Sequence, residues 1–444
     1  MRVLKFGGTS VGSPEALRRA VNIVRTELPD GGLVVVSALS GTTDTILEAV
    51  GLAAKGDVAG ARDRHATLRQ RHLAVAKDLG LLENVQPLWE PLFERLSGIL
   101  EGMGLLWEAS PRARDGALAI GETLSAQVVS LLLVSETIPA QFKDVREVMR
   151  TDARHGRALP DLAAIRAASE PWRQAILGGT VLVTQGFLGS SPDGATTTLG
   201  RGGSDTSATL LGEALGADEV QIWTDVDGVL SADPSLVPNA RPIPVMSLRE
   251  AAALSAFGAK VLHADSLAPL ARAGFRLIVA NTHRPAASRT EINVQPPPRR
   301  PGEITSVAYK EGLACLRIPP SRDIEPFFNV ALRLQEAGAS RYGLLSTPDG
   351  SLLLVRSETA DSEALLQELA KSGFDLQRGV AVVALVGEGL RAAPGRALAL
   401  LSSIQAEPIT GILAGDTGVS LAFLVPESRL STLIPRLHEH CIAN

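Results

Sequence analysis

Short apolar stretches alternate with amphipathic stretches along the first two-thirds of the chain. The first apolar stretch covers residues 3–6, and Leu17, Val21 and Val24 then recur at helical spacing. Further apolar stretches at 33–36, in TVLVTQGFLG and in EVQIWTD repeat the order strand, loop, helix. This alternation predicts an α/β fold, with an open, mainly parallel sheet and helices on both faces. Ligands of such sheets bind beyond the carboxyl ends of the strands.

Residues 54–107 have helical periodicity only. They include His65 and His72, whose spacing fits no common metal-ligand pair. We therefore expect both to be exposed helix residues, with metal ligation as the less favoured alternative. The composition changes at QPPPRRPG, residues 295–302, where a run of three prolines, and a fourth after the arginine pair, interrupt any regular element. This stretch predicts a linker, although its arginine pair could also form an anion patch.

Two similar units follow the linker. Each reads strand, helix, strand, strand, helix, which is the pattern of a ferredoxin-like module, and such duplication indicates a repeated supersecondary unit. We predict a catalytic domain at 1–294, a linker at 295–302 and modules at 303–378 and 379–444, with one strand that the two modules could share.

Composition narrows the class of protein. The 444 residues are 45% hydrophobic and 20% charged, and the net charge is −5. No basic stripe is present, so we expect no nucleic-acid partner, and no apolar run reaches the ~18 residues of a membrane span. Cys315 and Cys441 fit neither a disulfide framework nor a zinc site, which favours a reducing, cytoplasmic setting.

Two glycine-rich segments are candidates for phosphate or anion binding. In the opening MRVLKFGGTSVG, Lys5 ends a strand directly before a glycine loop, whereas in the P-loop the lysine follows the glycines. In GRGGSDTSATLLGEALG, residues 200–216, Ser204 and Asp205 begin a helix, and a helix N-terminus favours anions. Taken alone, this second segment fits a capped helix after a flexible loop equally well.

Two further segments carry polar residues at loop positions. In WTDVDGVLSADP, Thr224 and Asp225 end a strand and could meet a ribose hydroxyl or a metal, or could be solvated turn residues. In FGAKVLH, Lys260 lies near an expected helix start, where a lone lysine is ordinarily just exposed.

Together these segments resemble the aspartate kinases of the amino acid kinase superfamily. Eight motifs match in order, and they are KFGGTSVG, SALSGTTD, GETLS, RTDARHGRA, TQGFLG, TTTLGRGGSD, WTDVDGV and FGAKVLH. The paired C-terminal units look like the tandem ACT domains of the same enzymes, so the resemblance covers essentially the whole chain.

The resemblance implies ATP-dependent phosphorylation of the β-carboxylate of L-aspartate. This reaction is the first step toward lysine, threonine and methionine. Its partners would be L-aspartate and ATP, with Mg²⁺ held by the phosphates and water rather than by protein ligands. The ACT modules imply a homodimer or homotetramer.

The resemblance also implies roles for the matched residues. Lys5 would reach the transferring phosphoryl group, and Asp205 would orient Lys5 rather than accept a proton. The residues expected to bind the substrate are Thr43, Glu122, Arg201, Gly202, Gly203 and Ser204. Those expected to bind the nucleotide are Lys5, Gly7, Gly8, Ser10, Thr224, Asp225, Leu230 and Lys260.

Some positions depart from the family pattern. Leu230, Ser235 and Ala264 stand where relatives often have tyrosine, arginine and proline, which affects the expected affinity for ATP. In the first ACT module, PPSRDIEP and ASRYGLLS replace a glycine-containing turn and the usual run after the helix. We therefore expect weak or no inhibition by lysine.

Three alternatives are weighed against this interpretation. Another amino acid kinase, such as a glutamate kinase, would lack GETLS and the tandem ACT tail. A non-catalytic ACT-bearing sensor would have lost Lys5, Arg201 or Asp205, and all three are present. A protein of unrelated function with accidental motifs does not explain their order.

Overall fold

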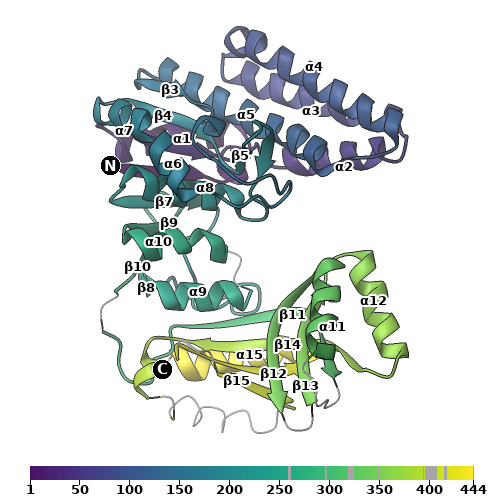
Figure 1. Cartoon of the computed structure of the whole chain (residues 1–444). Coiled ribbons are helices and arrows are strands. Elements are labelled where there is room, and N and C mark those ends of the chain that lie inside the picture. The colour runs from purple at the N-terminus through teal and green to yellow at the C-terminus, as the bar shows by residue number, and fades with distance from the viewer. Residues whose placement is uncertain are drawn as a thin grey trace. The chain divides into compact units, whose positions relative to one another are not determined.

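The chain forms two compact units (Figure 1). The computed structural model describes residues 1–258, 262–295, 298–318, 325–347, 350–393, 395, 408–414 and 418–443. The first unit comprises Met1–Val229, Pro244–Leu248 and Val261–Pro296. The second comprises Leu230–Ile243, Arg249–Lys260 and Pro297–Asn444. This division gives two units and does not test the predicted boundaries of the catalytic domain, the linker and the two modules. Those boundaries stay a prediction.

An eight-stranded sheet forms the centre of the first unit, in the order β3-β4-β2-β1-β7-β9-β10-β8. All neighbours are parallel except β9 and β10, so the predicted α/β fold with a mainly parallel sheet is confirmed. The strands are β1 Arg2–Phe6, β2 Gly32–Val36, β3 Ala140–Phe142, β4 Val181–Gln185, β7 Glu219–Thr224, β8 Val245–Ser247, β9 Arg276–Asn281 and β10 Thr290–Asn293. Beside it, β5 Leu188–Ser190 and β6 Thr196–Thr198 form an antiparallel pair.

Helices cover both faces of this sheet. Because side chains alternate along a strand, Leu4 and Phe6 join a core with α1 and α5, whereas Val3 faces Gly212 of α8. The helices are α1 Pro14–Glu27, α2 Thr42–Ala53, α3 Val58–Asp78, α4 Leu82–Leu106, α5 Pro111–Ser135, α6 Leu162–Ala168, α7 Glu170–Leu177, α8 Gly203–Leu215 and α10 Ala268–Ala273. Helix α9, Leu248–Ala256, lies mainly in the second unit.

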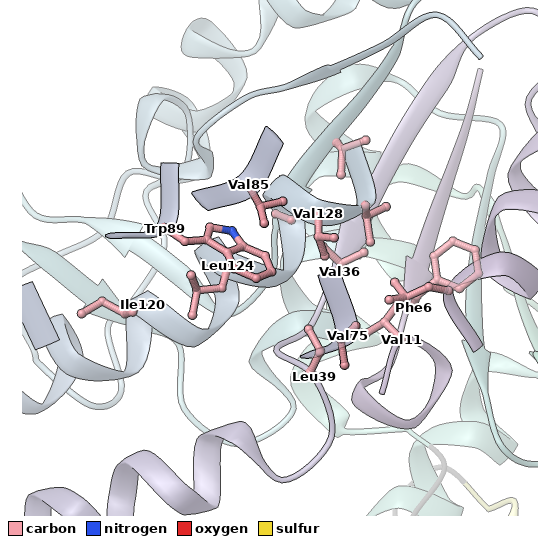
Figure 2. Packing of buried hydrophobic residues seen from close by; sticks show 14 of the residues in the cluster. Phe6, Val11, Val36, Leu39, Val75, Val85, Trp89, Ile120, Leu124 and Val128 are labelled. Atoms are coloured by element: carbon pink, nitrogen blue, oxygen red, sulfur yellow. The ribbon is translucent and has the colours of Figure 1, made fainter. Parts of the chain in front are cut away.

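One core cluster joins the sheet to the helical segment of the first unit. Figure 2 shows Trp89 beside Val85 and Leu124, with Phe6 and Val36 in the same cluster. Trp89 and Phe6 are fully buried. Helices α3 and α4 therefore extend the core rather than stand apart from it.

The expectation of exposed histidines in this segment is wrong. His72 is completely buried, its Nδ1 lies 2.8 Å from the Leu68 carbonyl oxygen, and burial lowers its pKa to about 4. His65 is half-buried, with Nε2 3.0 Å from the Phe93 carbonyl oxygen. Both rings pack edge-on against Phe93, so they are core residues. Within the described part of the chain, no group of His, Cys, Asp and Glu could hold a metal.

Helix α5 has the length and composition of a membrane-spanning helix. From the sequence we expect no apolar run of about 18 residues, and in α5 polar residues such as Glu122 interrupt the run. Moreover, 83% of the most apolar window of α5 is buried inside the protein, as in the core helix of a globular domain. Among the described residues no other helix passes the same test.

The second unit contains a six-stranded antiparallel sheet in the order β12-β13-β11-β14-β16-β15. Its strands are β11 Ser306–Ile318, β12 Ala339–Thr347, β13 Gly350–Ser357, β14 Asp375–Val386, β15 Gly411–Ala414 and β16 Ser420–Pro426. Its helices include α11 Glu325–Glu336, α12 Ala360–Lys371, α13 Gly389–Ala392 and α15 Leu430–His438.

The long central strand β11 serves two separate cores. Its far end, with Leu316, packs with residues of α11 and α12, whereas Val307 packs with β14, β16 and α15. Two modules that share central strands are consistent with the predicted pair of ACT domains. The helix expected around 396–402 and the turn at 319–324 lie outside the described residues.

Candidate active site

Lys5 and Asp205 meet at the carboxyl end of β1. Lys5 leaves the strand on the side opposite Leu4 and Phe6, and Asp205 lies in the first turn of α8. Lys5 Nζ is 2.6 Å from Asp205 Oδ1, and Lys5 is only 8% exposed. The ion pair fixes a buried cation at the edge of the sheet where parallel α/β folds bind ligands.

The loop after β1 is tied to the neighbouring strands. The Gly7 N–H donates to the Trp223 carbonyl at 3.0 Å. The buried Ser10 hydroxyl donates to the same carbonyl at 3.1 Å and lies 2.7 Å from Thr282 Oγ1. A Cβ on Gly8 would lie 3.0 Å from the Ala38 carbonyl oxygen, so this glycine permits a close approach of two loops. Gly7 and Ser10 therefore contribute by holding the loop in place.

Glu122 is a buried carboxyl on α5. It is 5% exposed, and burial raises its pKa to about 8, against the opposite effects of the Lys5 charge and the Ala38 backbone. Among the described residues, Glu122 Oε2 has no hydrogen-bond partner. A buried polar atom is ordinarily hydrogen-bonded, so this oxygen is suited to a ligand donor such as an ammonium group.

Hydroxyl groups lie at the start of α2 and on α5. Gly41 begins α2 in the left-handed conformation, followed by the buried Thr42 and the half-buried Thr43. Thr42 Oγ1 and, on α5, Ser125 Oγ are buried without a partner in the described structure. Sequence reasoning selected Thr43 but not these two hydroxyls.

Glycines shape the loop that leads into α8. Gly202 caps the helix with φ of 71°, and a Cβ there would lie 2.5 Å from the His263 Cβ. A Cβ on Gly203 would lie 2.7 Å from a ring carbon of Phe187. The exposed Arg201 therefore precedes a tightly packed turn that admits no side chains.

The residues expected at the nucleotide belong to both units. Thr224 ends β7, and its hydroxyl donates to Asp225 Oδ1 at 3.2 Å. Leu230 belongs to the second unit, where it forms an isolated bridge with Pro242. Lys260 lies outside the described residues.

The chain was compared with known proteins. Residues 1–281 match the model of the Amino acid kinase family. The chain is 33% identical over 448 residues to the lysine-sensitive aspartokinase 3 of Escherichia coli K12, covering 99% of this chain and 98% of that one. The chain belongs to the amino acid kinase family, among the aspartokinases. Over 281 residues the kinase is also 39% identical to an aspartokinase of Chlamydia trachomatis, covering 63% of the kinase and 61% of that protein.

Solved structures support the same assignment. The kinase is similar over its full length to E. coli aspartokinase III in complex with aspartate and ADP, with a TM-score of 0.87 and 31% identity over 100% of both chains. The complex of that enzyme with lysine and aspartate gives a TM-score of 0.83 at 31% identity, covering 100% of the kinase and 99% of that chain.

Asn281 is a residue of the site that the sequence analysis did not select. Its Nδ2 donates to Asp227 Oδ1 at 2.6 Å and to the Asp225 carbonyl at 3.3 Å. Its Oδ1 accepts from the His283 N–H at 2.8 Å. It thereby holds the turn after β7 against the end of β9. A polar residue directly after the apolar run LIVA, residues 277–280, was the available signal.

Replacing Gly202 by alanine should weaken substrate binding and stability together. A left-handed conformation costs an L-residue about 1–2 kcal/mol, and the contact with His263 forces the loop to shift. Gly216→Ala is the matched control, because Gly216 caps the other end of α8 at φ of 68° with open space around its Cβ. We expect both variants to lose thermal stability, Gly202→Ala more than Gly216→Ala, and a raised KM for the amino acid in Gly202→Ala alone. Equal KM values in both variants would contradict this role.

Proposed function

We propose that the kinase transfers the γ-phosphoryl group of ATP to the β-carboxylate of L-aspartate. A carboxylate oxygen forms a bond to the γ-phosphorus while the bond to the bridging β,γ-oxygen breaks, which gives 4-phospho-L-aspartate and ADP. The product would enter the synthesis of lysine, threonine and methionine. The observation that carries the proposal is the buried group of Lys5, Asp205 and Glu122, in a chain similar throughout to an aspartokinase.

The reaction needs no general base. A free aspartate side chain has a pKa near 3.9, so the nucleophile is ionised at neutral pH. The difficulty is the approach of two anions, and phosphoryl transfer is accelerated mainly by positioning and by cations.

Lys5 would stabilise the charge that develops on the transferring phosphoryl group. Asp205 holds its ammonium group, and the loop at Gly7, Gly8 and Ser10 brings the chain close to the phosphates. Mg²⁺ would be held mainly by the phosphates and by water. Thr224 and Asp225 would contact the nucleotide, together with Leu230 and Lys260.

Glu122 and Arg201 would recognise the two ends of the amino acid. The open oxygen of Glu122 suits the α-ammonium group, and a guanidinium such as that of Arg201 binds a carboxylate through two parallel hydrogen bonds. Thr43 and Ser204 would add hydrogen bonds, and the turn at Gly202 and Gly203 would set the position of Arg201.

The test is an ADP-release assay with ATP and Mg²⁺, with aspartate compared against glutamate. Hydroxylamine added in parallel converts an acyl phosphate to a hydroxamate and so identifies a carboxyl group as acceptor. We expect aspartate-dependent ADP release with a matching amount of hydroxamate. A preference for glutamate, or ADP release without hydroxamate, would contradict the proposal.

The second unit would act as a pair of ACT domains. We place the kinase in the cytoplasm as a homodimer or homotetramer held together through the second module. Support comes from the composition and from the exposed Ile412 on the edge strand β15, where a second sheet could pair. Light scattering of the purified kinase tests the assembly.

Lysine should inhibit the kinase weakly. A charged amino acid needs its ammonium and carboxylate paired when it leaves water, and three of the eight residues of PPSRDIEP are prolines, which have no N–H group. A titration of initial rate against lysine, with calorimetry for binding, measures the effect. Strong inhibition at micromolar lysine would show that these departures from the family pattern are tolerated.

A further inference from the structure

We propose that Asp115 is a positioning residue that sets the Arg201 loop relative to Glu122 and thereby controls affinity for the amino acid. The inference rests on the proposed function for its kinetic meaning. Asp115 lies on α5, is 1% exposed, and comes from a stretch, SPRARDGA, that none of the recognised motifs includes.

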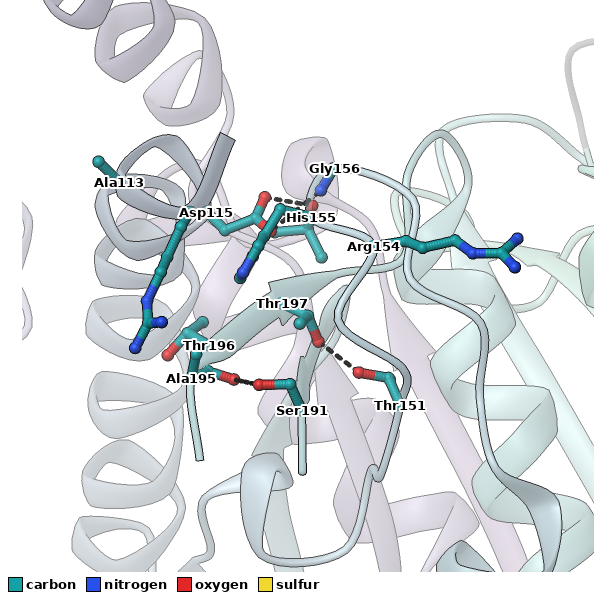
Figure 3. A network of polar contacts seen from close by, with 12 residues as sticks. Ala113, Asp115, Thr151, Arg154, His155, Gly156, Ser191, Ala195, Thr196 and Thr197 are labelled. Carbon is teal, nitrogen blue, oxygen red and sulfur yellow. Dashed lines mark hydrogen bonds and ion pairs between the residues drawn. The ribbon is translucent and has the colours of Figure 1, made fainter. Parts of the chain in front are cut away.

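Three donors from two other segments converge on this carboxylate, and Figure 3 shows two of the donor residues, His155 and Gly156, beside Asp115. Its Oδ2 accepts from the Gly156 N–H at 3.0 Å and from His155 Nδ1 at 2.9 Å. Its Oδ1 accepts from the Thr198 hydroxyl at 2.7 Å. Buried carboxylates are unfavourable unless hydrogen-bonded, so these contacts define one arrangement of the three segments.

Both segments that bind Asp115 adjoin the Arg201 loop, one along the chain and the other by packing against it. Thr198 ends β6, three residues before Arg201, and its carbonyl accepts from the Ala158 N–H at 2.9 Å. Gly200 adopts φ of 80°, and a Cβ there would lie 3.3 Å from the Gly156 carbonyl oxygen. The loop that Asp115 holds therefore packs directly beneath the backbone next to Arg201.

The same helix carries Glu122. Glu122 follows Asp115 by seven positions, which is close to two turns, so both side chains leave α5 from the same face. One rigid element therefore fixes the carboxyl proposed for the substrate ammonium and the anchor of the loop proposed for the substrate carboxylate. The distance between these two groups would depend on Asp115.

Asp115→Ala should raise the KM for aspartate about tenfold or more while the KM for ATP changes less than about twofold. Misplacing a binding group by about 1 Å is sufficient for effects of this size. Asp115→Asn should restore most of the affinity, because its oxygen can accept from Gly156 and His155 while its amide donates to Thr198. This rescue would separate positioning from a need for charge.

Thr151→Val is the matched control. It removes the 2.7 Å bond to Thr197 in the same network without touching Asp115 or Gly200. For Thr151→Val we expect a loss of thermal stability comparable with that of Asp115→Ala, and an unchanged KM for aspartate. An unchanged KM in Asp115→Ala, or equal rises in the KM for aspartate and for ATP, would overturn the inference. If Asp115→Ala does not fold, Thr198→Val removes one of the three bonds and decides the question in its place.

Amide hydrogen exchange provides a readout that does not depend on activity. In Asp115→Ala, exchange should accelerate in segments 154–158 and 198–203 but not in β1. Unchanged exchange in those segments would also overturn the inference. If the wild-type kinase releases no ADP with aspartate, the proposed function fails, and the exchange result still decides whether Asp115 holds the loop.

Discussion

Lys5→Ala should reduce kcat by about 10²–10³-fold or more while aspartate binding stays near the wild-type value. Removing one donor aimed at charge that develops in the transition state typically has an effect of this size. Lys5 is the buried cation of the described site, its Nζ is held 2.6 Å from Asp205, and its side chain is 10% exposed. Pre-steady-state and steady-state measurements of ADP release give kcat, and calorimetry with aspartate gives binding.

The loss of Lys5 also leaves Asp205 without its ion-pair partner. Breaking one side of a buried pair can destabilise a protein by about 3–5 kcal/mol, although the 16% exposure of the Asp205 side chain places the expected effect below that range. Thermal unfolding must therefore accompany the kinetics. Arg2→Ala is the control on the same strand, because Arg2 is exposed and pairs with Glu219 at 3.6 Å. Retention of more than half of wild-type kcat by a folded Lys5→Ala would show that Lys5 does not act on the phosphoryl group.

The sheet could be predicted from the sequence because its central strands are buried on both faces and are therefore almost continuously apolar. Apolar strands such as Val34–Val36 lie wholly inside the sheet, so their hydrophobicity is visible in the sequence without other information. Lys5 stood out for the same reason, because a cation inside an apolar run needs an explanation. That strand and its glycine loop predicted a ligand site at the carboxyl end of the sheet.

Residues fixed by long-range partners were harder to predict. His72 sits in a polar-looking helical stretch, RQRHLAV, yet the packing of α3 against Trp89 and Phe93 buries it. Periodicity describes one helix, whereas burial also depends on which other helix covers it. Asp115 was overlooked for a similar reason, since nothing near it in the sequence shows that Gly156 and Thr198 approach it.

Glu122→Gln should raise the KM for aspartate about 30-fold or more and leave the KM for ATP nearly unchanged. Truncating one member of a buried charge pair typically costs about 2–5 kcal/mol, and a factor of ten corresponds to about 1.4 kcal/mol. Glu136→Gln is the control, because Glu136 caps the end of the same helix and is largely exposed. An aspartate KM equal to that of the wild type in Glu122→Gln would remove this residue from the site.

The raised pKa of Glu122 gives the same variant a pH signature. Burial raises this pKa from 4.5 to about 8, so the substrate-free folded protein keeps a proton that the unfolded chain releases. The contribution of Glu122 to the free energy of unfolding is therefore fully present below pH 4.5. It is lost as the pH rises toward 8, by up to about 1.4 kcal/mol per pH unit. Glu122→Gln should lack this contribution to the slope, which denaturant titrations from pH 5 to pH 9 would measure.

Binding of the substrate should reverse the protonation of Glu122. An α-ammonium group pairs with the ionised carboxylate, so at neutral pH aspartate binding should release nearly one proton from a group with a pKa of about 8. The KM for aspartate should then fall as the pH rises toward 8 and level off above it, whereas the KM of Glu122→Gln should vary little over this range. Calorimetry in two buffers of different ionisation enthalpy counts the released protons directly. Binding without proton release at pH 7 would mean that the substrate ammonium group does not meet this carboxyl, because pairing and ionisation of Glu122 must occur together.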